Sequence, residues 1–337
     1  MTVAARRMIA LLVLLGAIPA QAADETDPRY RSVATIGDQR IAVGDAELPV
    51  YVSRDLSRPQ PGIRRAVLVL HGLLRNADVY FRSGLKAQSA AGAAGADSVM
   101  IAPQFLAAID VPAHGLSDRT LYWSYDGWEA GEPARGPTHA SSFDALDAIL
   151  FRVADPSLFP DMRMVVVSGH SGGAQIVQRY AVLGKAEAVL RERGISVRYV
   201  VANPSSYAWF SAQRPVQAIA QSCPGYDRWK YGMNDLPPYA DERNAASLEA
   251  AYAGRDVMYL LGALDTNPNH PALDKSCMAE AQGPYRYARG HAYFAALQAQ
   301  FGVRLHQTLH DVPGVGHKML TSSCGLSALF DIPACGP

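Results

Sequence analysis

The sequence has no excess of charge of either sign and no sustained apolar run of membrane-spanning length. Its 31 basic residues balance its 31 acidic residues, so no electrostatic attraction to nucleic acid or to an anionic membrane is expected. The apolar run at residues 8–18 is well short of the roughly 20 residues that a spanning helix needs. We therefore predict neither a nucleic-acid partner nor a stable membrane anchor.

The sequence also lacks internal repeats, heptads and the usual metal-binding spacings. It contains no Cys-x-x-Cys pair and no His-Glu-x-x-His motif. His306 and His310 are four residues apart, but no acidic partner accompanies them in the spacing that a zinc site needs. We therefore predict no metal site.

Cysteine is scarce, and all four cysteines lie in the C-terminal half of the chain. They are Cys223, Cys277, Cys324 and Cys335. Three pairings are possible, and an even count in an exported protein predicts disulfides. We favour the sequential pairs Cys223–Cys277 and Cys324–Cys335; four free thiols are the alternative.

Export is predicted from residues 1–22, which have the features of a signal peptide. A short basic region that includes Arg6 and Arg7 precedes the apolar run, and the Pro-Ala-Gln-Ala sequence ending at Ala22 gives a small-x-small cleavage pattern. Twin-arginine export is the weaker alternative, because the residues that normally flank the arginine pair are missing. We expect cleavage after Ala22 and a secreted or periplasmic protein.

The remainder, residues 23–337, is predicted to be one domain with an inserted cap. Apolar residues make up 49% of the chain and charged residues 18%, a balance that allows a sizeable core. The length exceeds that of a small domain but suits a single α/β domain with insertions. Residues 205–254 contain several prolines and aromatic residues without a clear strand, and we interpret them as the cap.

Apolar runs rich in β-branched residues alternate with helical segments along the chain. Buried strands are expected at 66–70, 98–103, 164–167, 197–202, 256–262 and 303–309, after leading antiparallel strands at 36–43 and 48–52. Helices are expected at 82–95, 141–152, 174–193 and 285–301. This alternation predicts an α/β fold with a mostly parallel central sheet and helices on both faces.

Residues 169–173, Gly-His-Ser-Gly-Gly, match the Gly-x-Ser-x-Gly pattern of a nucleophile elbow. The pattern follows an expected strand and precedes an expected helix, as an elbow requires. A serine at such a sharp turn projects its hydroxyl from the sheet edge, and the glycines allow close backbone packing. We predict that Ser171 is a nucleophile and that His170 is a packing residue; a glycine turn in the sheet core is the alternative.

The His-Gly pair at residues 71 and 72 ends the first expected central strand. In a hydrolase, the backbone at this point must donate hydrogen bonds to a developing oxyanion. We expect the donors to be the amides of Leu73 and Gly172, with residues 75 and 76 orienting the loop. His71 itself is interpreted as structural.

A general base and its acid partner are expected after the last two strands. His317 lies in a glycine-rich loop after the last strand, and Asp265 follows strand 256–262 in a Gly-x-x-Asp turn. Asp274 is the rival acid, whereas Asp256 is at the wrong end of its strand. The alternative interpretation of Asp265 is an ordinary surface aspartate in a turn.

These motifs, in the order Ser171, Asp265, His317, resemble those of the α/β-hydrolase superfamily over about residues 66–320. The resemblance implies the α/β-hydrolase fold and a Ser-His-Asp mechanism without a cofactor. The Leu-His-Gly-x-x-Arg-Asn-Ala loop is similar to that of secreted esterases and depolymerases, so a small-molecule or polymeric ester substrate is expected. The segment 203–209 is not a general feature of the superfamily.

An ester-cleaving enzyme of this kind needs side chains that line the pocket for the acyl group. Tyr207, Trp209, Tyr226 and Trp229 are candidates for an aromatic wall over the acyl pocket, with cap core as the alternative role. Two other functions stay open: a serine peptidase of the same fold, and a hydrolase-like binding protein without catalysis.

Overall fold

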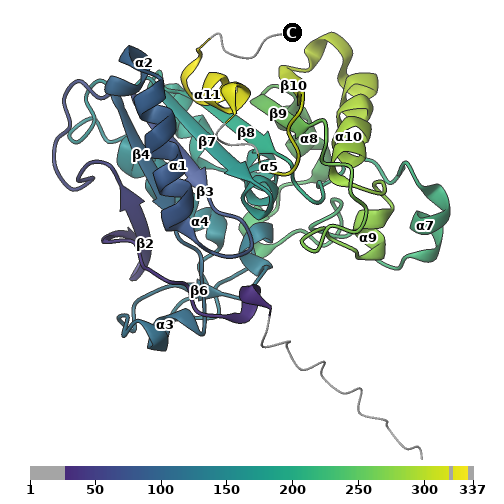
Figure 1. The fold of residues 1–337 in the computed structure, drawn as a ribbon, viewed down its shortest axis with the longest axis horizontal. Helices are drawn as coiled ribbons and strands as arrows, with labels where there is room; N and C mark the ends of the chain where they lie inside the picture. The colour runs from purple at the N-terminus through teal and green to yellow at the C-terminus, as the bar shows by residue number, and fades with distance from the viewer. Residues whose placement is uncertain (1–26, 319–321, 333–337) are drawn as a thin grey trace, which may run out of the picture.

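An eight-stranded sheet forms the centre of the protein, with helices on both faces (Figure 1). The computed structural model describes residues 27–318 and 322–332. The strand order is β1-β2-β4-β3-β7-β8-β9-β10. The β1–β2 and β2–β4 pairs are antiparallel, and every pair from β4 to β10 is parallel. The predicted mostly parallel sheet is confirmed.

The strands of the central sheet are β1 (Gln39–Val43), β2 (Ala46–Val52), β3 (Arg65–Leu70), β4 (Ser98–Pro103), β7 (Met164–His170), β8 (Ser196–Ala202), β9 (Asp256–Gly262) and β10 (Gln307–Val312). Two short strands, β5 (Leu106–Ala107) and β6 (Tyr122–Trp123), form a separate parallel pair.

The helices are α1 (Ala77–Ala90), α2 (Ala93–Ala96), α3 (Asp110–Ala113), α4 (Ser142–Val153), α5 (Gly172–Leu183), α6 (Ala186–Glu192), α7 (Gln217–Ser222), α8 (Ala245–Ala253), α9 (Cys277–Glu280), α10 (Arg286–Phe301) and α11 (Ser323–Phe330). Single 3-10 turns are formed by Pro28–Tyr30, Gly127–Ala130, Pro238–Ala240 and Gly302–Arg304.

Strand β3 shows how the sheet separates two hydrophobic layers. Ala66, Leu68 and Leu70 point into the layer formed with α4, α5, α8 and α10. Val67 and Val69 point into the layer formed with α1 and α11. Side chains of a strand alternate between the two faces, so a strand covered on both sides needs an unbroken apolar run.

Two expected elements differ from the structure at glycines. The single helix expected at 174–193 is divided into α5 and α6 at Gly184, whose ψ of 136° leaves the helical region. A Cβ added to Gly184 would lie 2.7 Å from the Tyr180 carbonyl oxygen, so the position admits no side chain. The last strand begins at Gln307 rather than at 303. Gly302 ends α10 with a positive φ of 53°, and the fully exposed Val303 belongs to the following 3-10 turn.

Residues 205–254 connect β8 to β9 and contain α7, the 238–240 turn and α8. The disulfide Cys223–Cys277 joins this segment to α9, as predicted. It therefore ties the connection between β8 and β9 to the one that follows β9. The second predicted pair includes Cys335, which lies outside the described residues.

The predicted signal peptide, residues 1–22, also lies outside the described residues. Within the described ranges, no helix combines the length and the apolar character that a membrane span requires.

Candidate active site

Ser171 stands at the turn between β7 and α5. Its backbone has φ 58° and ψ −120°, a conformation that a non-glycine residue adopts only when its surroundings enforce it. A Cβ added to Gly169 would lie 2.1 Å from the Gly173 carbonyl oxygen, and one added to Gly173 would lie 2.3 Å from that of Leu70. These contacts explain why glycine is needed on both sides of the turn.

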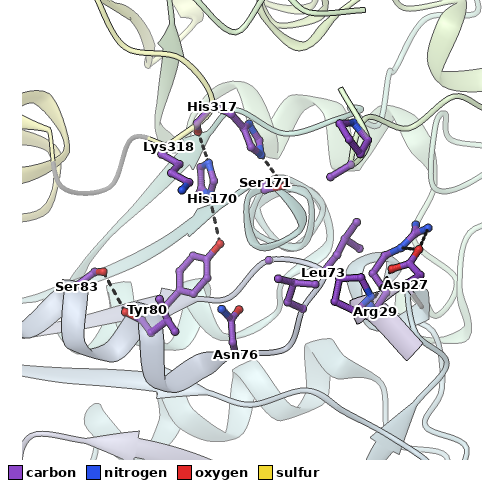
Figure 2. A pocket seen from close by; sticks show the side chains of 16 residues that line it. Asp27, Arg29, Leu73, Asn76, Tyr80, Ser83, His170, Ser171, His317 and Lys318 are labelled. Carbon is purple, nitrogen blue, oxygen red and sulfur yellow. Dashed lines mark hydrogen bonds and ion pairs between the residues drawn. The ribbon is translucent and has the colours of Figure 1, made fainter. Parts of the chain in front are cut away.

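The structure brings Ser171, His317 and Asp265 into one hydrogen-bonded chain. The Ser171 Oγ is 3.1 Å from His317 Nε2, and His317 Nδ1 is 2.8 Å from Asp265 Oδ2. The three residues follow β7, β10 and β9, three parallel strands whose carboxyl ends meet at one edge of the sheet. Figure 2 shows Ser171 and His317 facing each other above α5.

The Asp265 carboxylate is buried and holds the imidazole in one tautomer. Burial alone would raise the pKa of Asp265, but the hydrogen bond and charge of His317 and the Arg286 guanidinium keep it below its ordinary value. Arg286 Nη1 lies 3.5 Å from Asp265 Oδ1. An ionised carboxylate only accepts hydrogen bonds, so the His317 proton is on Nδ1 and the Nε2 lone pair faces Ser171.

Asp274, the rival acid, has other partners. Its Oδ2 accepts a hydrogen bond from the Tyr231 hydroxyl at 2.8 Å, and its Oδ1 accepts one from the Ser276 amide at 2.9 Å. The structure therefore brings Asp265, and not Asp274, to His317.

The two predicted oxyanion donors lie on adjacent stretches of backbone. A Cβ added to Gly172 would be 3.2 Å from the Leu73 amide nitrogen. In the described part of the chain, neither amide is used in another hydrogen bond. Gly172 is also the first residue of α5, where a helix presents unpaired N–H groups and positive potential. The arrangement can accept a negatively charged oxygen.

Trp128 and Glu129 fill the space in which a side chain at position 172 would lie. The same added Cβ would meet Glu129 Oε1 at 2.5 Å and the Trp128 ring at 3.4 Å. Burial raises the pKa of Glu129 to about 7, against the opposing charges of Lys230 and Arg179. Only glycine fits at position 172 with this packing.

The loop after β3 is held by Arg75, a fully buried cation. Its Nε donates to Asp110 Oδ2 at 2.9 Å, and its other nitrogens donate to the carbonyls of Arg29 and Arg31 at 2.7 and 2.8 Å. Arg75 thereby fastens residues 29–31 beside the loop that carries Leu73. These contacts are the kind expected of a residue that orients the loop, whereas the second residue named for that role, Asn76, lines the cleft.

An open cleft of about 710 Å³ leads to Ser171. Much of its wall is apolar and comes from Pro28, Leu73, Leu74, Val79, Tyr80, Pro271 and Ala272. Asp27, Arg29, Asn76 and Lys318 are polar or charged members of the lining (Figure 2). Leu74 and Val79 are 45% and 41% exposed, so the wall offers apolar surface to a bound group.

The aromatic residues expected to form this wall lie elsewhere. Tyr207 and Trp209 are buried in the core, where their rings pack against Tyr293 of α10 at 4.6 and 5.4 Å. Trp229 is partly buried and donates to the Ala130 carbonyl, while Tyr226 packs against the Arg214 guanidinium.

None of these four aromatic residues lines the cleft, which corrects their assignment as substrate contacts. Packing between large rings and α10 removes more apolar surface from water than a solvent-facing wall would. The role of 205–254 as a cap stays a prediction.

His71 is fully buried and lies two residues before Leu73, one of the predicted oxyanion donors. Its Nε2 accepts a hydrogen bond from the Phe105 amide at 2.9 Å, and its Nδ1 lies 2.9 Å from the Gly72 carbonyl. The imidazole is therefore neutral with its proton on Nδ1. Burial lowers the pKa of His71 to about 4.

Two contributors to the site escaped the sequence analysis. Asn203 follows β8, and its amide donates to the carbonyls of Gly316 and His317, both at 3.1 Å. Tyr80 of α1 lines the cleft, and its hydroxyl is 3.2 Å from His170 Nδ1. The available signal for Asn203 was its position directly after a strand, at the same sheet edge as Ser171 and Asp265.

No group of three or more metal-ligating side chains is found among residues 27–318 and 322–332. His306 directly precedes β10 and His310 lies within it, and neither belongs to such a group.

No protein-family model matches the sequence, and no curated protein is found as a relative. Solved structures do match. Poly(aspartic acid) hydrolase-1 from Sphingomonas sp. KT-1 has 22% identity and a TM-score of 0.59, covering 84% of this chain and 93% of its own. LpqC, a poly(3-hydroxybutyrate) depolymerase from Bordetella parapertussis, has 21% identity and a TM-score of 0.61, covering 88% and 91%. With its sheet order and these likenesses, the chain has the α/β-hydrolase fold.

Proposed function

We propose that this protein is a secreted serine hydrolase that cleaves carboxylic ester bonds through an acyl-enzyme, with Ser171, His317 and Asp265 as its catalytic residues. The observation that carries the proposal is the chain of hydrogen bonds from Ser171 Oγ through His317 to Asp265, at 3.1 and 2.8 Å. A serine alcohol is a weak nucleophile, and a neighbouring base oriented by a third group activates it.

In the first half of the reaction, Ser171 Oγ attacks the acyl carbon while His317 Nε2 takes its proton. Asp265 stabilises the imidazolium that forms without accepting the proton itself. The carbonyl π electrons move to oxygen, which the amides of Leu73 and Gly172 would bind. Collapse of this intermediate breaks the acyl–oxygen bond, and His317 returns the proton to the departing alkoxide.

In the second half, water takes the place of the alcohol. His317 removes a proton from the water as it attacks the acyl-serine carbon. The second tetrahedral intermediate then breaks its bond to Ser171 Oγ, to which His317 returns that proton. The products are a carboxylic acid and the free enzyme. Each proton is accounted for by His317, so the chemistry needs no further cofactor.

The cleft supports an ester whose acyl or alcohol part is largely apolar. Leu73, Leu74, Val79, Pro271 and Ala272 contribute apolar wall on the route to Ser171. The cleft is open, which would admit part of a longer chain. The two matched proteins are named for activity on poly(aspartic acid) and on poly(3-hydroxybutyrate), so a polymeric substrate joins small esters as a candidate.

The test uses the mature chain, residues 23–337, with a fluorophosphonate probe and a panel of p-nitrophenyl esters and aminoacyl-nitroanilides. We expect probe labelling and ester hydrolysis, both abolished in Ser171→Ala; loss of a triad serine commonly costs about 10⁶-fold in kcat. A folded Ser171→Ala variant that keeps appreciable turnover would refute the mechanism.

The same panel decides between the other candidate functions. Faster cleavage of nitroanilides than of esters would identify a peptidase, and an unlabelled, inactive parent protein would indicate a binding protein. Export is tested separately, by N-terminal sequencing of the exported chain, which should begin at Ala23.

A further inference from the structure

The general base proposed above is carried by a short surface loop, residues 313–318, that includes two glycines. The loop is fastened before His317 by a hydrogen bond from the Leu264 amide to the Val315 carbonyl, at 2.9 Å. Residues 319–321, which follow the loop, lie outside the described part. At His317 itself, the backbone carbonyl accepts hydrogen bonds from two side chains, His170 and Asn203.

His170 reaches this carbonyl from the elbow, directly before Ser171. A carbonyl only accepts hydrogen bonds, so the proton of the His170 ring is on Nε2 and its Nδ1 accepts from the Tyr80 hydroxyl at 3.2 Å. The His170 and His317 rings are 4.5 Å apart (Figure 2). Burial, with the charges of His317 and Arg286, lowers the pKa of His170 to about 3, so the ring stays neutral at ordinary pH.

Tyr80 extends this contact to the loop that carries Leu73. Its hydroxyl lies so close to Gly72 that a Cβ added there would be 2.9 Å away. A line of contacts thus runs from the loop after β3, through Tyr80 and His170, to the backbone of His317. It connects the predicted oxyanion loop with the proposed base.

Asn203 reaches the same carbonyl from the end of β8. It is fully buried and has a positive φ of 48°. Its Oδ1 accepts from the Gly262 amide at 2.9 Å, while its Nδ2 donates to the carbonyls of Gly316 and His317. Its own amide donates to the Leu260 carbonyl at 3.1 Å. An asparagine keeps a left-handed backbone conformation when its contacts compensate the strain. Here these contacts join β9 to the loop that carries His317.

We propose that His170 and Asn203 are positioning residues that clamp the His317 carbonyl from two sides and thereby hold the imidazole within reach of Ser171. The proposal rests on the function proposed above. Two side chains from neighbouring strand ends converge on the backbone carbonyl of the residue that carries the imidazole, so their loss moves the base. His170 also lines the cleft, whereas Asn203 does not. A displacement of about 1 Å at a reacting group can cost about 10²-fold in rate.

The experiment compares His170→Phe, His170→Gln and Asn203→Gly with the parent protein. Phenylalanine keeps a ring but offers no hydrogen bond, whereas the glutamine amide can donate to the carbonyl and accept from Tyr80. Glycine at 203 tolerates the positive φ and removes only the side chain. His139→Phe, at an exposed residue away from the cleft, is the matched control.

For His170→Phe and Asn203→Gly we expect kcat on a p-nitrophenyl ester to fall by about 10²-fold, with KM within about threefold. The second-order rate of fluorophosphonate labelling should fall in parallel, because it reports the same activation of Ser171. His170→Gln should recover much of the loss. Because both residues act on one carbonyl, the double variant should lose less than the product of the two single effects.

The outcomes separate this proposal from the one on which it rests. If the parent protein neither hydrolyses esters nor reacts with the probe, the proposed function fails. The positioning role is wrong if the parent is active and His170→Phe and Asn203→Gly, both folded by circular dichroism, keep kcat and the labelling rate near the parent values. An increase in KM with unchanged kcat also overturns it, as does a kcat for His170→Gln as low as that for His170→Phe. If one of these variants fails to fold, the other decides the matter together with Tyr80→Phe. For Tyr80→Phe we expect a smaller loss of kcat than for His170→Phe.

Discussion

Replacing Asp265 by asparagine tests which carboxylate serves His317. Asp265 lies between the His317 imidazole, whose Nδ1 donates to Oδ2 at 2.8 Å, and the Arg286 guanidinium, whose Nη1 forms an ion pair with Oδ1 at 3.5 Å. An asparagine has one acceptor oxygen and one donor nitrogen for these two positions. If its oxygen faces His317, its NH₂ group opposes the Arg286 guanidinium.

If the NH₂ group faces His317 instead, the imidazole must carry its proton on Nε2. That nitrogen then points an N–H at Ser171 and cannot accept the serine proton. The negative charge that would stabilise the imidazolium is lost in both arrangements. The corresponding change in a well-studied serine protease triad lowers kcat by about 10⁴-fold, equivalent to about 5 kcal/mol of transition-state stabilisation. We expect a loss of this order for Asp265→Asn.

The matched control is Asp274→Asn, which changes the same residue type nine positions later. Asp274 contacts Tyr231 and Ser276, so we expect kcat to change by no more than about threefold. Both variants are assayed for ester hydrolysis below their melting temperatures, because Asp265→Asn also leaves the buried Arg286 without its counter-charge. A crippled Asp274→Asn with near-normal Asp265→Asn would refute the assignment of the acid.

Two further predictions concern stability. The folded pKa of His71, about 4, lies below its ordinary value of 6.5, so its contribution is complete above about pH 6.5 and is lost as the pH falls towards 4. We expect this loss to reach about 3 kcal/mol, measured as the difference in pH dependence between urea unfolding of the parent and of His71→Gln; equal pH dependence would contradict it. Removing the Cys223–Cys277 disulfide, which spans 54 residues, with the double serine variant should lower the free energy of unfolding by about 2–4 kcal/mol, and an unchanged urea midpoint would count against this.

Much of the fold could be predicted from local sequence patterns. The β-branched runs at 66–70, 164–167 and 256–262 became central strands, because a strand covered on both faces needs apolar residues at every position. The Gly-His-Ser-Gly-Gly motif became a strand–turn–helix in which only glycine fits at two positions: a Cβ on Gly169 would meet the Gly173 carbonyl within the motif, and a Cβ on Gly173 would meet the Leu70 carbonyl of β3. Each of these features could be recognised because its pattern lies within a few consecutive residues.

Which residues contact one another in the site could be predicted only where the order of the strands in the sheet brings them together. Asp265, His317 and Ser171 each follow a parallel strand, so sheet topology alone brings them to one edge. Asp274, a few residues farther along the loop, was not excluded by the sequence. Its actual contacts with Tyr231 and Ser276 are set by the path of the chain between β9 and α9.

Other assignments were decided by tertiary packing alone. Tyr207 and Trp209 have the composition of a binding wall, yet they pack against Tyr293, because burial of a ring depends on which helix lies opposite it. His170 and Asn203 gave no sign that they would meet at the His317 carbonyl, since they are separated from it by more than a hundred residues in the chain. Sequence by itself determined the strands, the elbow and the order of the candidate catalytic residues, whereas the cleft walls and the hydrogen bonds to the His317 carbonyl form only where distant segments come together.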